Sequence, residues 1–422
     1  MLKHKGELPK GVKPFLHSAA VAKRMVEERV LEVFSRWGYR EIVTPALEYC
    51  DSLALGMGAD FQENAYTLID RETGQLMALR PDMTPQIARI AATSLRDLPK
   101  PLRLCYAGNV FRYIEPQLGC PRELFQAGVE LIGLTSPEAD VEMIAVAVES
   151  LKEIGLQDFR ITVSQVNFFR GLLEEMGLEG EDQEQIKEAI QKKDRSALEK
   201  ILGRISLTGT QREVLLRFPF LFGCEEVLEE AGRLANNSVS LSALQNLAQV
   251  YAMLQVYKVD DFVIIDLAEL RDLDYYTGIV FEGFTRELGY RICGGGRYDR
   301  LLGKYGASFP ATGFALDIER AILALGRRGS WRGEKNVDFL IIDFQPDKSQ
   351  ALTLARNLRE KGYRVARDII RRNLEDSLAY AGNSHISQAI ILGLADLAPQ
   401  TALLKDIASG TEKVVEIAKI LE

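Results

Sequence analysis

The chain has 422 residues, of which 47% are hydrophobic and 27% charged, which is enough to bury at least one sizeable core in two or three domains. The formal net charge of −8 and the pI near 5.3 argue mildly against a protein whose main task is to bind nucleic acid. No uncharged apolar run of about eighteen residues occurs, and the start of the chain lacks the apolar region of a secretory signal. We therefore expect a cytoplasmic protein with no membrane segment.

The cysteines and histidines are scattered along the chain. The five cysteines form no CxxC pair, which is typical of reduced thiols and not of a disulfide framework or a zinc site. The three histidines, His4, His17 and His385, are equally isolated. Metal chemistry and Ser-His-Asp catalysis are therefore poorly supported, and we expect neither a metal nor a cofactor.

The first predicted elements are a helix and a strand-to-helix turn. Apolar residues recur at three- and four-residue spacing over residues 18–37, which predicts an amphipathic helix. Residues 42–45 are extended, and the proline among them favours an edge or interface position. A predicted strand at 76–79 runs into a turn that contains Asp82 and Thr84, with Thr84 as the expected N-cap of a helix. Such a turn offers backbone N–H groups and the positive end of a helix dipole.

Two longer strands are predicted at 102–112 and 124–132. In the second strand Gln126 and Glu130 fall on one face, whereas the alternate positions, such as Val129, are apolar. One face of this strand should therefore pack on the core, and the other should be polar.

The next segments predict helices and then a return to strands. A helix should run from Ser136 to near Gly155, and residues 166–258 are largely helical in pattern, which indicates a helical insertion. The following expected elements are three strands and a closing helix, at 262–266, 278–285, 290–293 and 316–325.

A polar, glycine-rich stretch at 326–335 predicts a linker before a second domain at 336–422. In that domain strands alternate with helices, which predicts a small α/β domain with a partly parallel sheet. The expected strands lie at 337–344, near 365, at 389–392 and at 402–404, and a terminal helix follows them.

Several polar residues have the types that a free amino acid requires. Its ammonium group needs a carboxylate, its carboxylate needs arginine or helix-end N–H groups, and its side chain needs a shaped pocket. Taken singly, these residues have ordinary structural explanations, such as a helix cap, a solvated strand face or a buried tyrosine pair. The set consists of Asp82, Thr84, Arg112, Gln126, Glu130, Arg271, Tyr275 and Tyr276.

The segments that carry these residues resemble histidyl-tRNA synthetase, a class II aminoacyl-tRNA synthetase, in the same order and over nearly the whole chain. The matching segments are 79–84, 111–130, 271–277 and 293–299. Class II motif 1 would lie around Pro45, motif 2 at 111–130 and motif 3 at 313–320. The glycine run at 294–296 could be mistaken for a phosphate loop, but no Gly-Lys-Ser/Thr follows it.

The resemblance implies an α+β fold and a histidine pocket. The core at residues 1–325 would be a class II synthetase-like antiparallel sheet with helices, and the C-terminal domain would be an anticodon-binding-like α/β module. By position, Asp82, Thr84 and Gln126 would hold the histidine ammonium group. Arg112 and Arg271 would lie near its carboxylate. The residues expected around the imidazole are Glu130, Tyr276 and Tyr298, with Tyr275 beside them.

Two positions depart from an adenylating synthetase, and both would face ATP. Where the family has an acidic residue against the adenine, this chain has Ile114, and Glu115 beside it would point to the other side of a strand. Where motif 3 has a glycine that makes room for ATP, this chain has Asp317. A carboxylate about 4 Å from a phosphate would repel it by roughly 4 kcal/mol, or about a thousandfold in affinity, unless Asp317 recruits Mg²⁺.

This pattern resembles a paralogous family, the regulatory subunits of ATP phosphoribosyltransferase, which share the form of residues 79–89. The resemblance implies a chain without synthetase activity that binds free histidine and mediates feedback inhibition of the first step of histidine biosynthesis. It also implies a short-form catalytic subunit as partner, with this chain as a homodimer within a hetero-octamer. Binding of tRNA is not expected.

Two alternatives stay open at the level of the sequence. An active histidyl-tRNA synthetase would explain why Arg112, Arg271 and Arg320 are retained, and why a full-looking C-terminal domain is present. A histidine sensor that works without the transferase would carry the same residues as a regulatory subunit.

Overall fold

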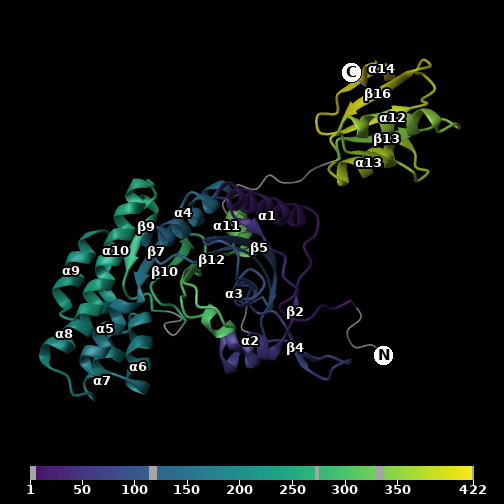
Figure 1. Ribbon diagram of the computed structural model, residues 1–422. Helices are drawn as coiled ribbons and strands as arrows, with labels where there is room; N and C mark the ends of the chain where they lie inside the picture. The colour runs from purple at the N-terminus through teal and green to yellow at the C-terminus, as the bar shows by residue number, and fades with distance from the viewer. Residues whose placement is uncertain (1–5, 114–120, 271–274, 328–336, 421–422) are drawn as a thin grey trace. The chain divides into compact units, whose positions relative to one another are not determined.

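The structure is a computed structural model that describes residues 6–113, 121–270, 275–327 and 337–420. The chain divides into two compact units, Met1–Arg332 and Gly333–Glu422 (Figure 1). Most of the stretch predicted as a linker, 326–335, lies outside the described residues. Within the part of the chain that is described, no helix is both long and apolar enough to cross a bilayer.

A nine-stranded mixed sheet forms the centre of the larger unit, in the order β1-β5-β6-β12-β11-β10-β7-β9-β8. The pairs from β5 across to β7 are all antiparallel, whereas β1 runs parallel to β5 and β9 parallel to β7. This largely antiparallel sheet with its covering helices confirms the predicted α+β class. The strands are β1 (Arg40–Glu41), β5 (Leu102–Phe111), β6 (Glu123–Ile132), β7 (Phe159–Gln165), β8 (Phe222–Gly223), β9 (Val263–Asp266), β10 (Ile279–Thr285), β11 (Cys293–Arg297) and β12 (Ala311–Asp317).

Three helices cover the apolar face of this sheet: α1 (Ser18–Arg36), α4 (Pro137–Glu153) and α11 (Ile318–Arg327). The heptad-like spacing of Val26, Val30 and Val33 buries all three on that face, as the sequence predicts. Helix α1 ends before Gly38, whose φ of 80° lies in the left-handed region that favours glycine. The β6 side chains that pack under these helices include Ala127 and Val129. Because side chains alternate along a strand, the residues between them must point to the opposite face of the sheet.

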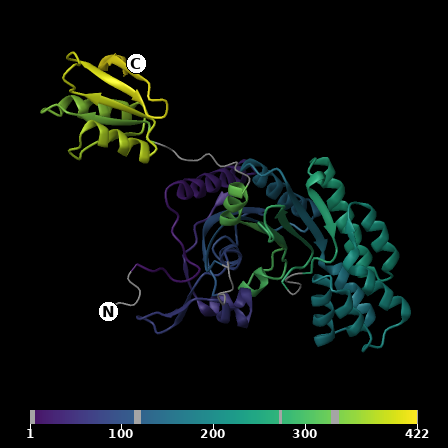
Figure 2. The same ribbon diagram turned by 180° about the vertical axis from the view of Figure 1, so that it is seen from behind.

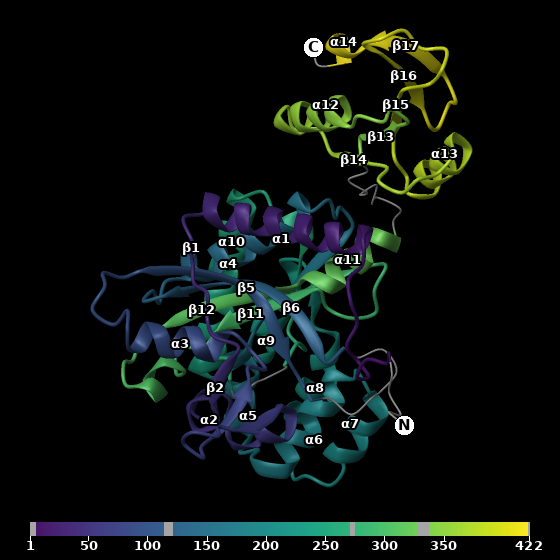
Figure 3. The same ribbon diagram turned by 90° about the vertical axis from the view of Figure 1, so that its right-hand side faces the viewer.

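The opposite face of the sheet meets α3 (Thr84–Ala92), and Figure 3 shows α1 and α3 on opposite sides of β5 and β6. Met83 and Ile87 pack there against Tyr106 and Tyr298. Beside α3 lies a three-stranded sheet in the order β2-β4-β3, with α2 (Cys50–Met57) packed on it. Its strands are β2 (Leu47–Tyr49), β3 (Thr67–Ile69) and β4 (Leu76–Leu79).

The stretch predicted as a helical insertion lies between β7 and β9 and holds helices that gather at one side of the larger unit (Figure 2). They are α5 (Val166–Met176), α6 (Gly180–Gln191), α7 (Arg195–Leu202), α8 (Gly209–Arg217), α9 (Glu226–Leu234) and α10 (Ser238–Val256). Helix α10 packs on both α4 and α5, which joins these helices to the core. The short strand β8 within the stretch pairs with β9 at the edge of the large sheet.

The smaller unit has a five-stranded sheet in the order β14-β13-β15-β16-β17. Strand β13 runs parallel to β14 and β15, and the remaining pairs are antiparallel. Helix α12 packs on one face through Leu354 and Leu358, and α13 packs on the other through Ala381. The elements are β13 (Phe339–Asp343), α12 (Ser349–Glu360), β14 (Val365–Arg367), α13 (Leu374–Asn383), β15 (Gln388–Leu392), β16 (Thr401–Asp406), β17 (Glu412–Glu416) and α14 (Ile417–Ile420).

Two local predictions were wrong. The strand expected at 290–293 lies at Cys293–Arg297 instead, so the glycine run is part of a central strand. The predicted terminal helix is present as Ile417–Ile420, but β17, an exposed edge strand that precedes it, was not predicted. Thr84 is not the N-cap of α3 but its first residue, and the carboxylate of Asp82 accepts the Thr84 N–H at 3.0 Å.

Candidate ligand-binding site

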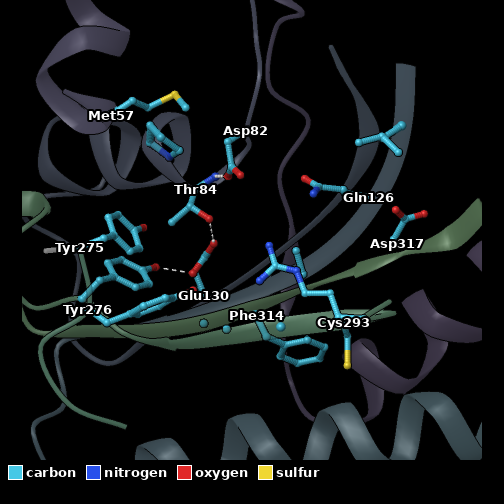
Figure 4. Close-up of a pocket in the computed structure, with 18 of the residues that line it drawn as sticks. Met57, Asp82, Thr84, Gln126, Glu130, Tyr275, Tyr276, Cys293, Phe314 and Asp317 are labelled. Atoms are coloured by element: carbon cyan, nitrogen blue, oxygen red, sulfur yellow. Dashed lines mark hydrogen bonds between the residues drawn. The ribbon is translucent and has the colours of Figure 1, made fainter. Parts of the chain in front are cut away.

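A cavity of about 370 Å³ opens on the α3 side of the large sheet, a size typical of small-ligand sites (Figure 4). Strands β6, β11 and β12 form its floor, and the start of α3 and the tyrosine-rich segment after residue 274 form its walls. Arg271, also predicted to bind the ligand, lies outside the described residues. The other predicted residues all line the cavity: Asp82, Thr84, Arg112, Gln126, Glu130, Tyr275, Tyr276 and Tyr298.

Glu130 lies at the closed end of the cavity and is 1% exposed. Its carboxyl group accepts hydrogen bonds from the hydroxyls of Thr84, at 2.8 Å, Tyr106, at 3.4 Å, and Tyr298. Burial raises the pKa of Glu130 to about 8, an effect that the hydrogen bonds from Tyr298 and Thr84 oppose only in part and the charge of Asp82 reinforces. The carboxyl group therefore retains its proton at neutral pH.

Two strand glycines make room for the Glu130 carboxyl group and for the Tyr106 hydroxyl that donates to it. Gly313 lies opposite Glu130 on β12, and a Cβ there would come within 1.7 Å of Glu130 Oε2. A Cβ at Gly128 would come within 2.5 Å of the Tyr106 hydroxyl. Glycine inside a strand weakens the strand, so close approach of a buried polar group explains its presence at both positions.

Three tyrosines form the wall next to Glu130. The Tyr275 ring stacks on the Tyr298 ring with centroids 5.5 Å apart, and it meets the Tyr276 ring edge-on at 5.0 Å. Burial raises the pKa of Tyr275 and of Tyr298, so both hydroxyls remain protonated and can donate. The wall thus combines flat apolar surfaces with hydroxyl groups, which suits a flat polar ring.

Asp82, Arg112 and Gln126 supply charged and polar atoms at the more open part of the cavity. Arg112 Nη2 lies 3.1 Å from Asp82 Oδ2, and Arg112 Nε donates to the Pro81 carbonyl oxygen at 2.9 Å. The Asp82 and Arg112 side chains are each about one-third exposed, at 32% and 31%. Among the described residues, the buried Gln126 Oε1 has no hydrogen-bond donor. A donor from a ligand would relieve the cost of leaving that oxygen unpaired.

Asp317, the position that departs from a synthetase, lies across from Gln126 in the register of β12 and β6. Its Oδ1 accepts the Arg320 N–H at 3.0 Å, and its Oδ2 lies 3.1 Å from Arg320 Nε. Burial raises the pKa of the Asp317 carboxyl group, and the hydrogen bond from the Arg320 backbone opposes this. Ile114, the other departure, lies outside the described residues.

The sequence did not single out Tyr106, Gly313, Arg291 or Glu282. Tyr106 lies on β5 at the position paired with Gly128 of β6, so strand alternation gives a signal only once that pairing is known. Arg291 lines the cavity and pairs with Glu282 of β10, a contact that depends on the register of β10 and β11.

Comparison with known proteins places this fold and site in a class. The family model described as histidyl-tRNA synthetase matches residues 11–321. A crystal structure of an ATP phosphoribosyltransferase regulatory subunit/histidyl-tRNA synthetase from Bacillus halodurans is 30% identical, has a TM-score of 0.82, and covers 92% of this chain and 99% of its own. Histidyl-tRNA synthetase from Nostoc sp. PCC 7120, at 24% identity and a TM-score of 0.82 over 99% and 98% of the two chains, shows the same fold. The fold and the family match thus place the chain in the histidyl-tRNA synthetase-like class.

Relatives with higher sequence identity show which family within this class the chain belongs to. A protein of Geobacter sulfurreducens is 45% identical over 413 residues, which cover 98% of this chain and 94% of the relative. A protein of Syntrophotalea carbinolica is 42% identical over 414 residues, or 98% and 96% of the two chains. Both are named ATP phosphoribosyltransferase regulatory subunit. The chain belongs to this family of regulatory subunits, and the membership predicted from its sequence is confirmed.

Proposed function

We propose that this chain is the non-catalytic regulatory subunit of an ATP phosphoribosyltransferase, and that it acts in the cytoplasm by binding free histidine and inhibiting the first step of histidine biosynthesis. The observation that carries the proposal is the identity of 42–45% over 98% of the chain with relatives of that name. The chemistry of the cavity supports histidine as the ligand, independently of the names.

Histidine fits the distribution of polar groups along the cavity. Its ammonium group would lie between the Asp82 carboxylate, the Thr84 hydroxyl and Gln126 Oε1, a buried acceptor for which the described residues supply no donor. Its carboxylate would lie near Arg112, with Arg271 as a further proposed contact.

The imidazole would lie against the tyrosine wall, with Glu130 and the hydroxyls of Tyr276 and Tyr298 as partners for its two nitrogens. The proton that Glu130 retains at neutral pH can pass to a neutral imidazole, which gives an imidazolium paired with a carboxylate. An apolar analogue would offer no acceptor for the Glu130 proton, so the site should discriminate strongly against it.

We propose that histidine acts allosterically and not at the transferase active site. Histidine would stabilise one arrangement of the synthetase-like dimer, and that arrangement would favour the inactive state of the catalytic subunit. Because such coupling is reciprocal, binding of the catalytic subunit must change the histidine affinity by the same factor.

The proposed assembly is a homodimer of this chain within a hetero-octamer that contains the short-form catalytic subunit. Exposed apolar side chains on and beside the three-stranded sheet support the homodimer, because a surface of this kind is unfavourable in water. Val43 is 84% exposed and Ile69 is 67% exposed. The others are Leu47, Tyr49, Leu68 and Leu76.

We also propose that the chain has no synthetase activity and does not act on tRNA. Asp317 supports this, because its carboxylate lies in the part of the cavity where motif 3 of a synthetase would accommodate ATP. The rival function, an active histidyl-tRNA synthetase, predicts histidine-dependent exchange of labelled pyrophosphate into ATP. Appreciable exchange by the purified chain would rule out the non-catalytic proposal.

Calorimetric titration of the purified chain with histidine tests the proposed site. The wild type should bind histidine, and Glu130→Ala should lose binding while its assembly state in light scattering is unchanged. Glu72→Ala, on an exposed turn of the same unit, is the matched control and should bind as the wild type does. Unchanged binding by Glu130→Ala would show that histidine does not occupy this cavity.

A further inference from the structure

Every arginine that lines the cavity in the described part of the chain is paired with a carboxylate of the same chain. Arg112 pairs with Asp82 at 3.1 Å, and Arg320 pairs with Asp317 at 3.1 Å. Arg291 pairs with Glu282. Three positive charges thus meet three negative charges, and Glu130 is protonated at neutral pH. The described charges in and beside the cavity therefore balance.

The three pairs differ in how firmly they are held. Asp82 is 32% exposed, whereas Asp317 is 12% exposed and Glu282 only 6%. Asp317 also caps α11 through the Arg320 N–H. The outer pair can therefore separate to receive a ligand, whereas the two inner carboxylates are fixed by burial and by the fold.

Arg320 is held from several sides. Besides Asp317, its Nη1 donates to the Arg291 carbonyl oxygen at 2.8 Å, and its guanidinium lies 4.8 Å from the centroid of the Tyr290 ring. An anion that approached Arg320 would compete with these contacts and would also meet the Asp317 carboxylate. The cationic groups of this part of the cavity are therefore already satisfied.

We propose that Asp317 and Glu282 are internal counter-anions that make the cavity specific for a zwitterionic amino acid and exclude polyphosphates. A zwitterion inserts between Asp82 and Arg112 by exchanging one ion pair for two, and it adds no net charge. A polyphosphate adds several negative charges beside two buried carboxylates that cannot move away. The inference rests on the proposed function, because it specifies why the same site would accept histidine and reject a nucleotide.

Substitutions that remove charge and keep shape provide the test. Asparagine is as good an N-cap as aspartate, so Asp317→Asn keeps the cap and removes the counter-anion. Glu282→Gln keeps a hydrogen-bond acceptor for Arg291. Inorganic tripolyphosphate in EDTA buffer of low ionic strength is the probe, and calorimetry gives its affinity. Asp338→Asn is the matched control, because it removes a carboxylate paired with Arg364 in the other unit.

The expected result is an affinity gain that depends on the freed arginine. Asp317→Asn should bind tripolyphosphate about tenfold or more tightly than the wild type, and the double variant with Glu282→Gln should bind more tightly still. Adding Arg320→Gln to Asp317→Asn should remove the gain. Asp338→Asn should bind as weakly as the wild type.

Two results would overturn the inference. The first is that Asp317→Asn and the double variant both bind tripolyphosphate no more tightly than the control Asp338→Asn. If the double variant does not fold, the comparison of Asp317→Asn with the control decides. The other is that Mg²⁺ makes the wild type bind tripolyphosphate more tightly than Asp317→Asn, since Asp317 would then recruit a metal for the phosphate. Titration of the wild type with histidine tests the proposed function separately, so failure of one is distinguishable from failure of the other.

Discussion

Replacing Glu130 by glutamine should remove a large pH dependence of the free energy of unfolding. The folded protein holds the Glu130 pKa at about 8, against an ordinary value of 4.5. Above about pH 4.5 the unfolded chain loses this proton while the folded chain keeps it, so the folded state binds more protons and the free energy of unfolding falls as pH rises. The contribution is fully present below pH 4.5 and is lost as pH rises through about 8. At about 1.4 kcal/mol for each pKa unit, the total change is about 5 kcal/mol.

Urea unfolding of the wild type and of Glu130→Gln, followed by circular dichroism at pH 5 and pH 8.5, measures this change. Glutamine cannot ionise, so the wild type should lose about 4 kcal/mol more than the variant between pH 5 and pH 8.5, which spans most of the titration. Burial also raises the pKa of Asp140, to about 6, but that carboxyl group is present in both proteins and its effect cancels in the comparison. Glu72→Gln controls for loss of a carboxylate on the surface. An equal pH dependence in wild type and Glu130→Gln would refute the protonated state of Glu130 on which the balanced charge of the cavity depends.

The same proton should shape histidine binding, because the bound pair of imidazole and Glu130 shares one proton. The histidine affinity measured by calorimetry should be highest between about pH 6.5 and about pH 8. Below this range the imidazole of free histidine is already protonated, and above it Glu130 is ionised. An affinity that only rises or only falls with pH would contradict the pairing. Gly313→Ala places a Cβ 1.7 Å from Glu130 Oε2. It should lower the histidine affinity at least about a hundredfold and the free energy of unfolding by about 1–3 kcal/mol. Unchanged histidine binding in calorimetry would show that Glu130 does not need this space. Ile69→Asp should shift the chain towards monomer in light scattering, whereas Val256→Asp, at a residue 81% exposed on another part of the same unit, should not; a dimer that survives Ile69→Asp would place the homodimer interface elsewhere.

The parts of the fold with clear periodicity could be predicted from the sequence. Helix α1 has one buried face, and in β6 the apolar residues Phe125, Ala127, Val129 and Leu131 alternate with Gln126, Gly128 and Glu130. The apolar pattern alone therefore fixes which of these residues join the main core. The polar face of β6, with Gln126 and Glu130, follows from the same pattern. Burial of these side chains in a common cavity is the structural consequence.

The parts without side-chain pattern could not be predicted in this way. The glycines of β11 have no side chains to alternate, and their place in a central strand depends on close packing: a Cβ at Gly295 would lie 2.1 Å from the Gly313 carbonyl oxygen. Strand β17 has little buried apolar surface, and it forms by pairing with β16. Local propensity does not determine such pairing.

The contacts that set the charge balance of the cavity could not be predicted from the sequence either. Arg291 and Glu282 are brought together by the register of two antiparallel strands, which places Glu282 opposite Gly294. Asp317 could be singled out as a departure from the synthetase pattern, but its pairing with Arg320 follows from its position at the start of α11. The functional meaning of these charges thus depends on geometry and not on residue type alone.

The most direct test of the proposed function is the rate of a short-form ATP phosphoribosyltransferase mixed with this chain, measured as histidine is added. We predict that the transferase is active only in the mixture and that histidine inhibits it in a saturable way. A mixture containing Glu130→Ala should remain active at the same histidine concentrations. A transferase whose rate does not depend on this chain, or whose inhibition by histidine persists with Glu130→Ala, would contradict it.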